Sequence, residues 1–129
     1  MAHYSILITS PPIEDAGIHT AQQFARALPA QGHVLDNVFF YGAGVLNANA
    51  LSQPASDETF PYQRWQLVQS ETECRLIVCI TAALKRGIVG EAEALENGDS
   101  QYNLKAPFEQ AGLGEFFSAL HNCNHLVQF

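Results

Sequence analysis

Cys79 is the side chain in this sequence that is best suited to covalent chemistry. It lies near the end of an apolar, β-branched run, residues 76–80, which is typical of a strand buried on both faces. Small residues follow, then a basic pair and Gly87, and they predict a short helical turn. A thiol at this junction would lie near unpaired backbone N–H groups and the positive end of a helix dipole, which favour the thiolate. The sequence therefore indicates a nucleophilic cysteine, and the alternative is a buried cysteine that acts as a small core hydrophobe.

The expected position of Cys79 matters because open parallel sheets bind ligands just beyond the carboxyl ends of their strands. Lys85 and Arg86 add positive potential there if they fold back over the turn. The loop that begins Ser10-Pro11-Pro12 follows the first predicted strand and ends at the same edge. We therefore expect this loop to form a wall of the site.

The other two cysteines are predicted to be structural. Three cysteines without a C-x-x-C pair argue against a disulfide framework and a structural zinc site. Cys74 lies at the far end of the same strand as Cys79, too distant to form a disulfide with it. Cys123 would share a face with His121 and His125 in an extended chain, which suggests a soft-metal site. The turn needed there breaks this alternation, so we assign Cys123 to packing.

No other motif indicates a metal or a cofactor. Three carboxylates lie within six residues, at Glu91, Glu93 and Glu96, but helical spacing splays them and no histidine joins them. Gly42 and Gly44 match the start of a dinucleotide-binding fingerprint, in which Asn47 occupies the third glycine position. We therefore expect neither a bound metal nor a nucleotide cofactor.

Composition narrows the class of protein. A chain of 129 residues with 47% hydrophobic content fits one globular domain over residues 1–129. It has neither an apolar run near the ~20 residues that span a bilayer nor a secretory signal pattern, so we expect a cytoplasmic protein without a membrane partner. A formal charge of −7 with six Lys and Arg in total disfavours direct contact with nucleic acid.

Hydrophobic periodicity predicts alternating strands and helices. Strands are expected at 4–9, 33–41 and 76–80, around Phe108 and at the carboxyl terminus, with helices over 18–30, 62–73, 91–96 and 115–120. The last helix should turn Phe116, Phe117 and Leu120 to the sheet. The polar residues 47–57 should form an ordered loop or a fragment of helix over the strand ends. Three aromatic residues are expected to be exposed and are interface candidates, with ordinary packing as an equal alternative for each: Phe60, Tyr62 and Tyr102.

This order of elements predicts an α/β fold of flavodoxin-like size, a three-layer α/β/α sandwich with a mainly parallel five-stranded sheet.

Motifs spread along nearly the whole chain resemble those of the DsrE-type sulfur-relay family, most closely its TusD-like members. The segments that carry this resemblance are Val38-Phe39-Phe40-Tyr41, Gly44-Val45, Asn47-Ala48-Asn49, Pro54-Ala55-Ser56-Asp57-Glu58, Cys79 with Ala82-Ala83-Leu84 and Arg86-Gly87, Gly112-Leu113-Gly114, and Val127-Gln128-Phe129. Residues 11–17, after the first strand, depart from the family pattern. The resemblance implies a DsrE-like version of the predicted fold.

The resemblance further implies that Cys79 matches the sulfur-carrying cysteine of a sulfurtransferase that needs no cofactor. Such a cysteine accepts persulfide sulfur from a TusA-like donor and passes it to an acceptor similar to TusE or DsrC. TusD-like chains work with TusC-like and TusB-like subunits in a dimer of heterotrimers, and their relay feeds 2-thiolation of the wobble uridine in tRNA. The chemistry of the residues agrees, because a carrier must attack as a thiolate and then hold the persulfide away from other thiols.

Other functions remain open at this stage. Close relatives act as DsrE subunits of DsrEFH-type complexes in dissimilatory sulfur oxidation. A non-catalytic scaffold, which only assembles the complex, is a different class, and Cys79 at the strand end argues against it. A flavin- or nucleotide-binding domain would need a phosphate-cradling glycine loop where Ser10-Pro11-Pro12 stands.

Overall fold

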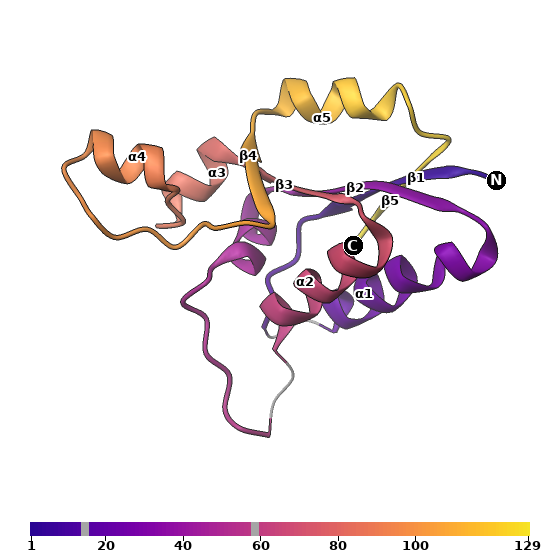
Figure 1. The fold of residues 1–129 in the computed structure, drawn as a ribbon, viewed down its shortest axis with the longest axis horizontal. Helices are drawn as coiled ribbons and strands as arrows, with labels where there is room; N and C mark the ends of the chain where they lie inside the picture. Colours follow the sequence, from indigo (N-terminus) through magenta and orange to yellow (C-terminus); the bar gives the residue numbers. More distant parts are fainter. Residues whose placement is uncertain (14–15, 58–59) are drawn as a thin grey trace.

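A computed structural model describes residues 1–13, 16–57 and 60–129 and contains one five-stranded sheet with helices around it (Figure 1). Its strands are β1 (His3–Ile8), β2 (Val34–Phe40), β3 (Arg75–Cys79), β4 (Phe108–Ala111) and β5 (His125–Gln128). They lie in the order β4-β3-β2-β1-β5, and every neighbouring pair is parallel. The predicted α/β architecture is confirmed, and the strand order places β3 between β2 and β4.

The helices are α1 (Gly17–Ala27), α2 (Pro61–Thr72), α3 (Ile80–Lys85), α4 (Glu91–Glu96) and α5 (Leu113–Leu120), with 3-10 helices η1 (Pro29–Gln31) and η2 (Gly42–Ala48). Helices α1 and α2 lie on one face of the sheet, and α5 lies on the other (Figure 1). Right-handed crossovers explain this division. The chain crosses the sheet in one direction from β1 to β4, and its return from β4 to β5 reverses that direction, so α5 comes to the opposite face. None of the helices within the described ranges is long and apolar enough to cross a membrane.

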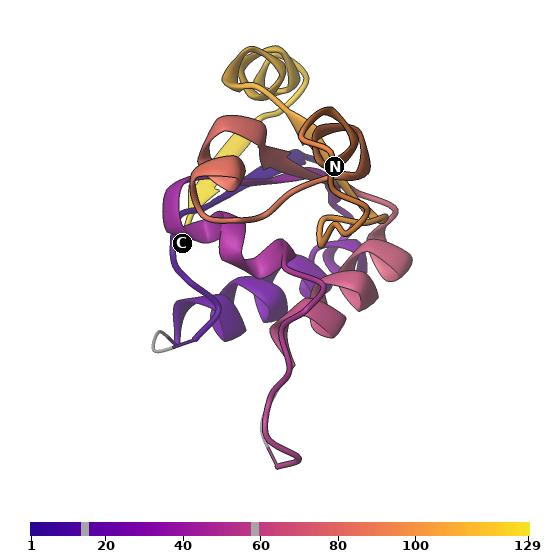
Figure 2. The ribbon, with the colours of Figure 1, turned by 90° about the vertical axis from the view of Figure 1, so that its left-hand side faces the viewer.

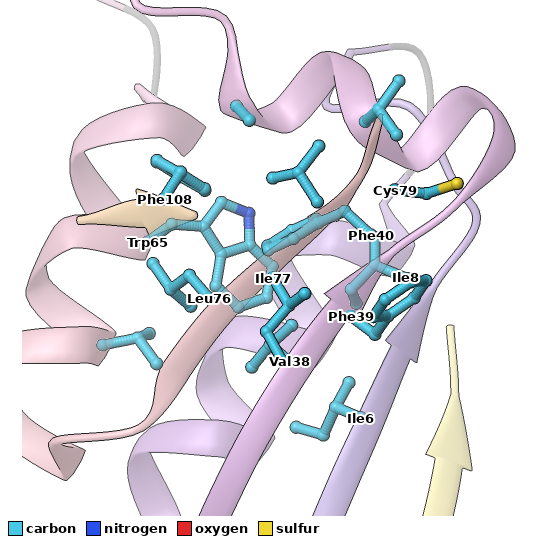
Figure 3. Close-up of a cluster of buried hydrophobic side chains, with 14 of the residues drawn as sticks. Ile6, Ile8, Val38, Phe39, Phe40, Trp65, Leu76, Ile77, Cys79 and Phe108 are labelled. Carbon is cyan, nitrogen blue, oxygen red and sulfur yellow. The ribbon is translucent and has the colours of Figure 1, made fainter. Parts of the chain in front are cut away.

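Strand β2 is buried on both faces and holds the two helical layers in place. On one face the Phe40 ring lies 5.1 Å from the Trp65 ring of α2 (Figure 3). On the other face the Phe39 ring lies 4.6 Å from the Phe116 ring of α5. The buried Trp65 indole donates its N–H to Asn47 Oδ1 of η2 at 3.1 Å, so the polar atom of this large side chain is satisfied.

Several local predictions need correction. Phe117 is 59% exposed and does not face the sheet, because α5 turns Phe116 and Ala119 inward instead. Tyr62 is buried, because its ring stacks on Phe108 at a centroid distance of 5.2 Å. Helix α1 ends at Ala27, shortly before Pro29 begins η1.

The predicted ordered loop at 47–57 is only partly correct. Its first residues belong to η2, and the backbone N–H of Ala50 donates to the Asn103 carbonyl at 2.9 Å. Residues 52–57 instead extend away from the sheet (Figure 2). Three residues that entered the sequence predictions, Glu14 and Asp15 of the first loop and Glu58 near the second, lie outside the described residues.

Gly44 allows η2 to pack directly against the end of β1. A Cβ atom at Gly44 would lie 2.1 Å from the carbonyl oxygen of Ile8. The same carbonyl accepts the backbone N–H of Tyr41 at 2.9 Å. Gly42 has a φ of 57°, in the left-handed region that favours glycine, and it starts η2. These two glycines therefore fix η2 across the carboxyl edge of the sheet.

Replacing Gly44 with alanine should lower the free energy of unfolding by about 2–3 kcal/mol in urea titrations, because the new methyl group displaces packed backbone. Gly114→Ala is the matched control, since its Cβ would meet no heavy atom within 4 Å. Within α5 this control should raise the free energy of unfolding by up to ~1 kcal/mol. Equal effects of the two substitutions would contradict the close contact at Ile8.

Candidate active site

Cys79 is the last residue of β3 and lies directly before α3. It pairs with Ala111 of β4, and its backbone is extended (φ −63°, ψ 115°). The side chain is 4% exposed, and its sulfur points away from the Phe40 and Trp65 rings (Figure 3). The thiol therefore lies at the boundary between the core and the carboxyl edge of the sheet.

A cavity of about 460 Å³ opens next to Cys79. Three chain segments supply its walls: Tyr41 and Gly42 after β2, Thr81 with Ala82, Lys85 and Arg86 of the α3 region, and Gly112 with Leu113 after β4. The segments meet because β2, β3 and β4 are parallel neighbours, so their carboxyl ends lie at the same edge. The structure thus brings the predicted nucleophile and the predicted basic pair into one cavity.

The cavity has positive electrostatic character. Lys85 and Arg86 both line it, and neither forms an ion pair within the described residues. Arg86 folds back along α3, where its Nη1 donates to the Ala82 carbonyl at 3.1 Å. Since none of the described lining residues is acidic, the two cations face the cavity without a compensating carboxylate.

Asn103 ties the chain after α3 to η2, and the sequence analysis missed this residue. Its Oδ1 accepts the Val89 backbone N–H at 2.7 Å, while its Nδ2 donates to the Gly87 carbonyl and to Asn49 Oδ1, both at 3.0 Å. These bonds connect the segments that carry the basic pair and Gly42. No local pattern distinguishes Asn103 from other loop asparagines, so only its contacts reveal this role.

The other two thiols lie outside the Cys79 cavity, and burial raises the pKa of each. Cys74 precedes β3 at the opposite end of the strand, roughly 16 Å away for five extended residues. Burial raises the pKa of the Cys74 thiol to about 11, so this thiol stays protonated at neutral pH. Burial, and then the charge of Asp36, also raise the pKa of Cys123. Both are free cysteines, and neither belongs to the Cys79 cavity.

The remaining candidate clusters serve other purposes. The Cys123 thiol contacts the Ala119 carbonyl at 3.5 Å, and the His125 ring lies 4.9 Å from the Tyr4 ring. Glu93 of the acidic segment accepts a hydrogen bond from Gln110 Nε2 at 2.6 Å. In the part of the chain that the structure describes, no group of three or more His, Cys, Asp or Glu side chains is arranged to hold a metal ion.

None of the described residues of the loop after β1 lines the Cys79 cavity. Two of them, Pro12 and Ile13, line a different cavity, next to α1. Tyr41 and Leu113 line the Cys79 cavity, where this loop was expected to form a wall. They follow β2 and β4, the strands that flank β3, and the sequence could have indicated them only if the strand order had been known.

The chain is similar to known proteins over nearly its full length. The model of the DsrE/DsrF-like family matches residues 2–129. A sulfurtransferase TusD homolog of Aliivibrio fischeri is 41% identical over 126 residues, which are 98% of this chain and 97% of that protein. A sulfurtransferase TusD homolog of Vibrio cholerae is 40% identical over 126 residues, 98% of this chain and 96% of that protein.

Among solved structures, the ychN protein from E. coli resembles this chain with a TM-score of 0.77, over 100% of both chains. The sequence identity is 18%, so this likeness shows the shared fold alone.

Because the pKa of Cys74 is raised, the free energy of unfolding should change with pH in the alkaline range. The folded protein keeps this proton between about pH 9 and about pH 11, where an unfolded thiol has lost it. The free energy of unfolding should therefore fall across this interval as pH rises, by up to ~1.4 kcal/mol per pH unit from this group. Urea titrations of Cys74→Ala should show a shallower fall than the wild type. If the free energy of unfolding fell equally steeply with pH in both proteins, the raised pKa of Cys74 would be contradicted.

Proposed function

Because the chain belongs to the DsrE/DsrF-like family, we propose that it is a sulfurtransferase subunit that carries persulfide sulfur on Cys79 within a protein relay. The observation that carries this proposal is the placement of Cys79 at a cavity with two unpaired cations, far from the other thiols. The similarity to two sulfurtransferase TusD homologs at about 40% identity supports sulfur transfer as the activity.

The proposed transfer balances without an oxidant or a reductant. The Cys79 thiolate attacks the outer sulfur of a donor persulfide, R–S–SH. The S–S bond of the donor breaks as a new S–S bond forms on Cys79, and the donor leaves as the thiolate R–S⁻. In the second step an acceptor thiolate attacks the outer sulfur of the Cys79 persulfide, which restores the Cys79 thiolate.

Lys85 and Arg86 have a direct electrostatic role in this chemistry. The Cys79 thiolate, the leaving donor thiolate and an ionised persulfide are all anions. The reaction takes place at a cysteine that is only 4% exposed. Two cations without carboxylate partners stabilise negative charge in such a site. The isolation of Cys79 from Cys74 and Cys123 keeps the persulfide from being resolved as an intramolecular disulfide.

We further propose that the relay is the one that thiolates the tRNA wobble uridine. The donor would be TusA-like, the acceptor TusE-like, and the chain would assemble with TusC-like and TusB-like subunits in a dimer of heterotrimers. The charge of −7 supports transfer through proteins rather than direct contact with tRNA. Free thiols persist in a reducing compartment, so we place this relay in the cytoplasm.

Intact mass spectrometry tests the carrier role directly. After incubation with a TusA-like protein that bears a cysteine persulfide, the wild-type chain should gain the mass of one sulfur, and a thiol reductant should remove it. Cys79→Ser should gain none, whereas the matched control Cys123→Ser should load like the wild type.

Loading of Cys74 or Cys123 in place of Cys79 would overturn the proposal. The same holds if no cysteine gains sulfur when TusC-like and TusB-like subunits are present. The second outcome would favour the scaffold function.

The basic pair should control the rate of loading. Lys85→Gln and Arg86→Gln should each lower the second-order rate constant of sulfur transfer about 3- to 10-fold at low ionic strength, because each removes one cation from the cavity. The difference from wild type should shrink as salt is added. Lys105→Gln is the control, since this lysine lies over the Tyr102 ring and does not line the cavity. Equal rates for all three variants would exclude a local electrostatic effect.

A further inference from the structure

A second cavity, of about 450 Å³, lies next to α1 and is not used by the proposed sulfur transfer. Helix η2 borders both cavities, with Gly42 in the wall of the first and Leu46 and Asn47 in the wall of the second. The second cavity has mainly apolar walls, which include Ile13, Ile18, Leu46, Pro54, Phe60 and Tyr62. Its volume falls in the range typical of sites for small organic molecules.

One polar atom in this wall lacks a partner. Gln22 is 1% exposed and lines the cavity, and its Nε2 donates to the Pro61 carbonyl at 3.1 Å. Gln22 Oε1 is buried and accepts no hydrogen bond from the described residues. Buried carbonyl oxygens are almost always paired, so this orphan acceptor indicates a missing donor.

The neighbouring polar side chain is already satisfied. Asn47 donates from Nδ2 to the Ser10 and Gly44 carbonyls, and its Oδ1 accepts the Trp65 indole N–H. Asn47 therefore supports the fold of η2 rather than offering a free group to a ligand. Gln22 Oε1 remains as the acceptor that a bound molecule would satisfy.

The walls also define the kind of molecule that fits. The Phe60 and Tyr62 rings lie 6.0 Å apart at 33°, and Tyr62 is fixed by stacking on Phe108, so these rings provide flat, rigid surfaces. The described lining residues include His19 but no Lys or Arg, so the wall holds no permanent cation for a phosphate or carboxylate ligand.

We propose that this cavity binds a small, largely apolar ring compound that donates one N–H or O–H hydrogen bond to Gln22 Oε1.

A matched pair of probes, indole and 1-methylindole, tests this proposal, because they differ in little but the N–H donor. In NMR titrations of the ¹⁵N-labelled full chain, indole should shift the Gln22 side-chain amide and the backbone amides of Ile18 and Leu46. Indole should bind about 5-fold more tightly than 1-methylindole, as expected for one hydrogen bond to a buried acceptor.

Two variants locate the hydrogen bond. Gln22→Leu should bind both probes equally, and its retained binding of 1-methylindole would show that the cavity is intact. Gln23, the exposed residue next to Gln22, provides the control. Gln23→Leu should still bind indole about 5-fold more tightly than 1-methylindole. If Gln22→Leu does not fold, Ser52→Trp serves instead, because the larger ring occupies the cavity and should abolish binding of both probes.

Three results would overturn the proposal. They are the absence of shifts with indole up to its solubility limit, equal affinities of the two probes for the wild type, and shifts confined to residues outside this cavity. None of these outcomes depends on whether Cys79 carries sulfur, so the two proposals fail separately.

Discussion

Parallel pairing of β3 between β2 and β4 is the constraint on which the Cys79 site depends. The register aligns Phe40 with Val78 and Cys79 with Ala111, so the residues that follow β2 and β4 begin beside the thiol. In this way segments near positions 41, 79 and 112 share one cavity although they are far apart in the chain. An antiparallel neighbour would bring its amino end to this edge, and the loop after it would lie on the far side of the sheet.

The burial of β2 makes this arrangement rigid. Phe39 and Phe40 point to opposite faces and pack against α5 and α2, so β2 cannot shift without disturbing both helical layers. At the carboxyl edge, Gly44 lies against β1 and Asn103 joins η2 to the segment after α3. The cavity walls are therefore irregular segments that a packed sheet and a few buried hydrogen bonds hold in place.

The distribution of charge gives the site its local character. Arg26 pairs with Glu71 between α1 and α2, and Arg75 pairs with Glu109 and Glu115 between the sheet and α5. Among the described residues, two of the six basic side chains are thus neutralised in ion pairs, whereas Lys85 and Arg86 line the Cys79 cavity without a carboxylate partner. An acidic chain consequently has a small positive site next to the Cys79 thiol, while its overall charge disfavours a phosphate backbone.

The sequence by itself determined the fold class and the place of Cys79 at the end of a strand. The β-branched run that ends at Cys79 and the fold class follow from periodicity and propensity, which act over a few neighbouring residues. The separation of Cys74 from Cys79 follows equally from the length of one strand.

Only the tertiary structure decided which residues surround the thiol. Tyr41 and Leu113 became walls, Pro12 and Ile13 turned to another cavity, and Phe117 remained exposed, because each depends on strand order and helix orientation. These features arise from pairing and packing between positions dozens of residues apart, and local patterns carry no information about such contacts.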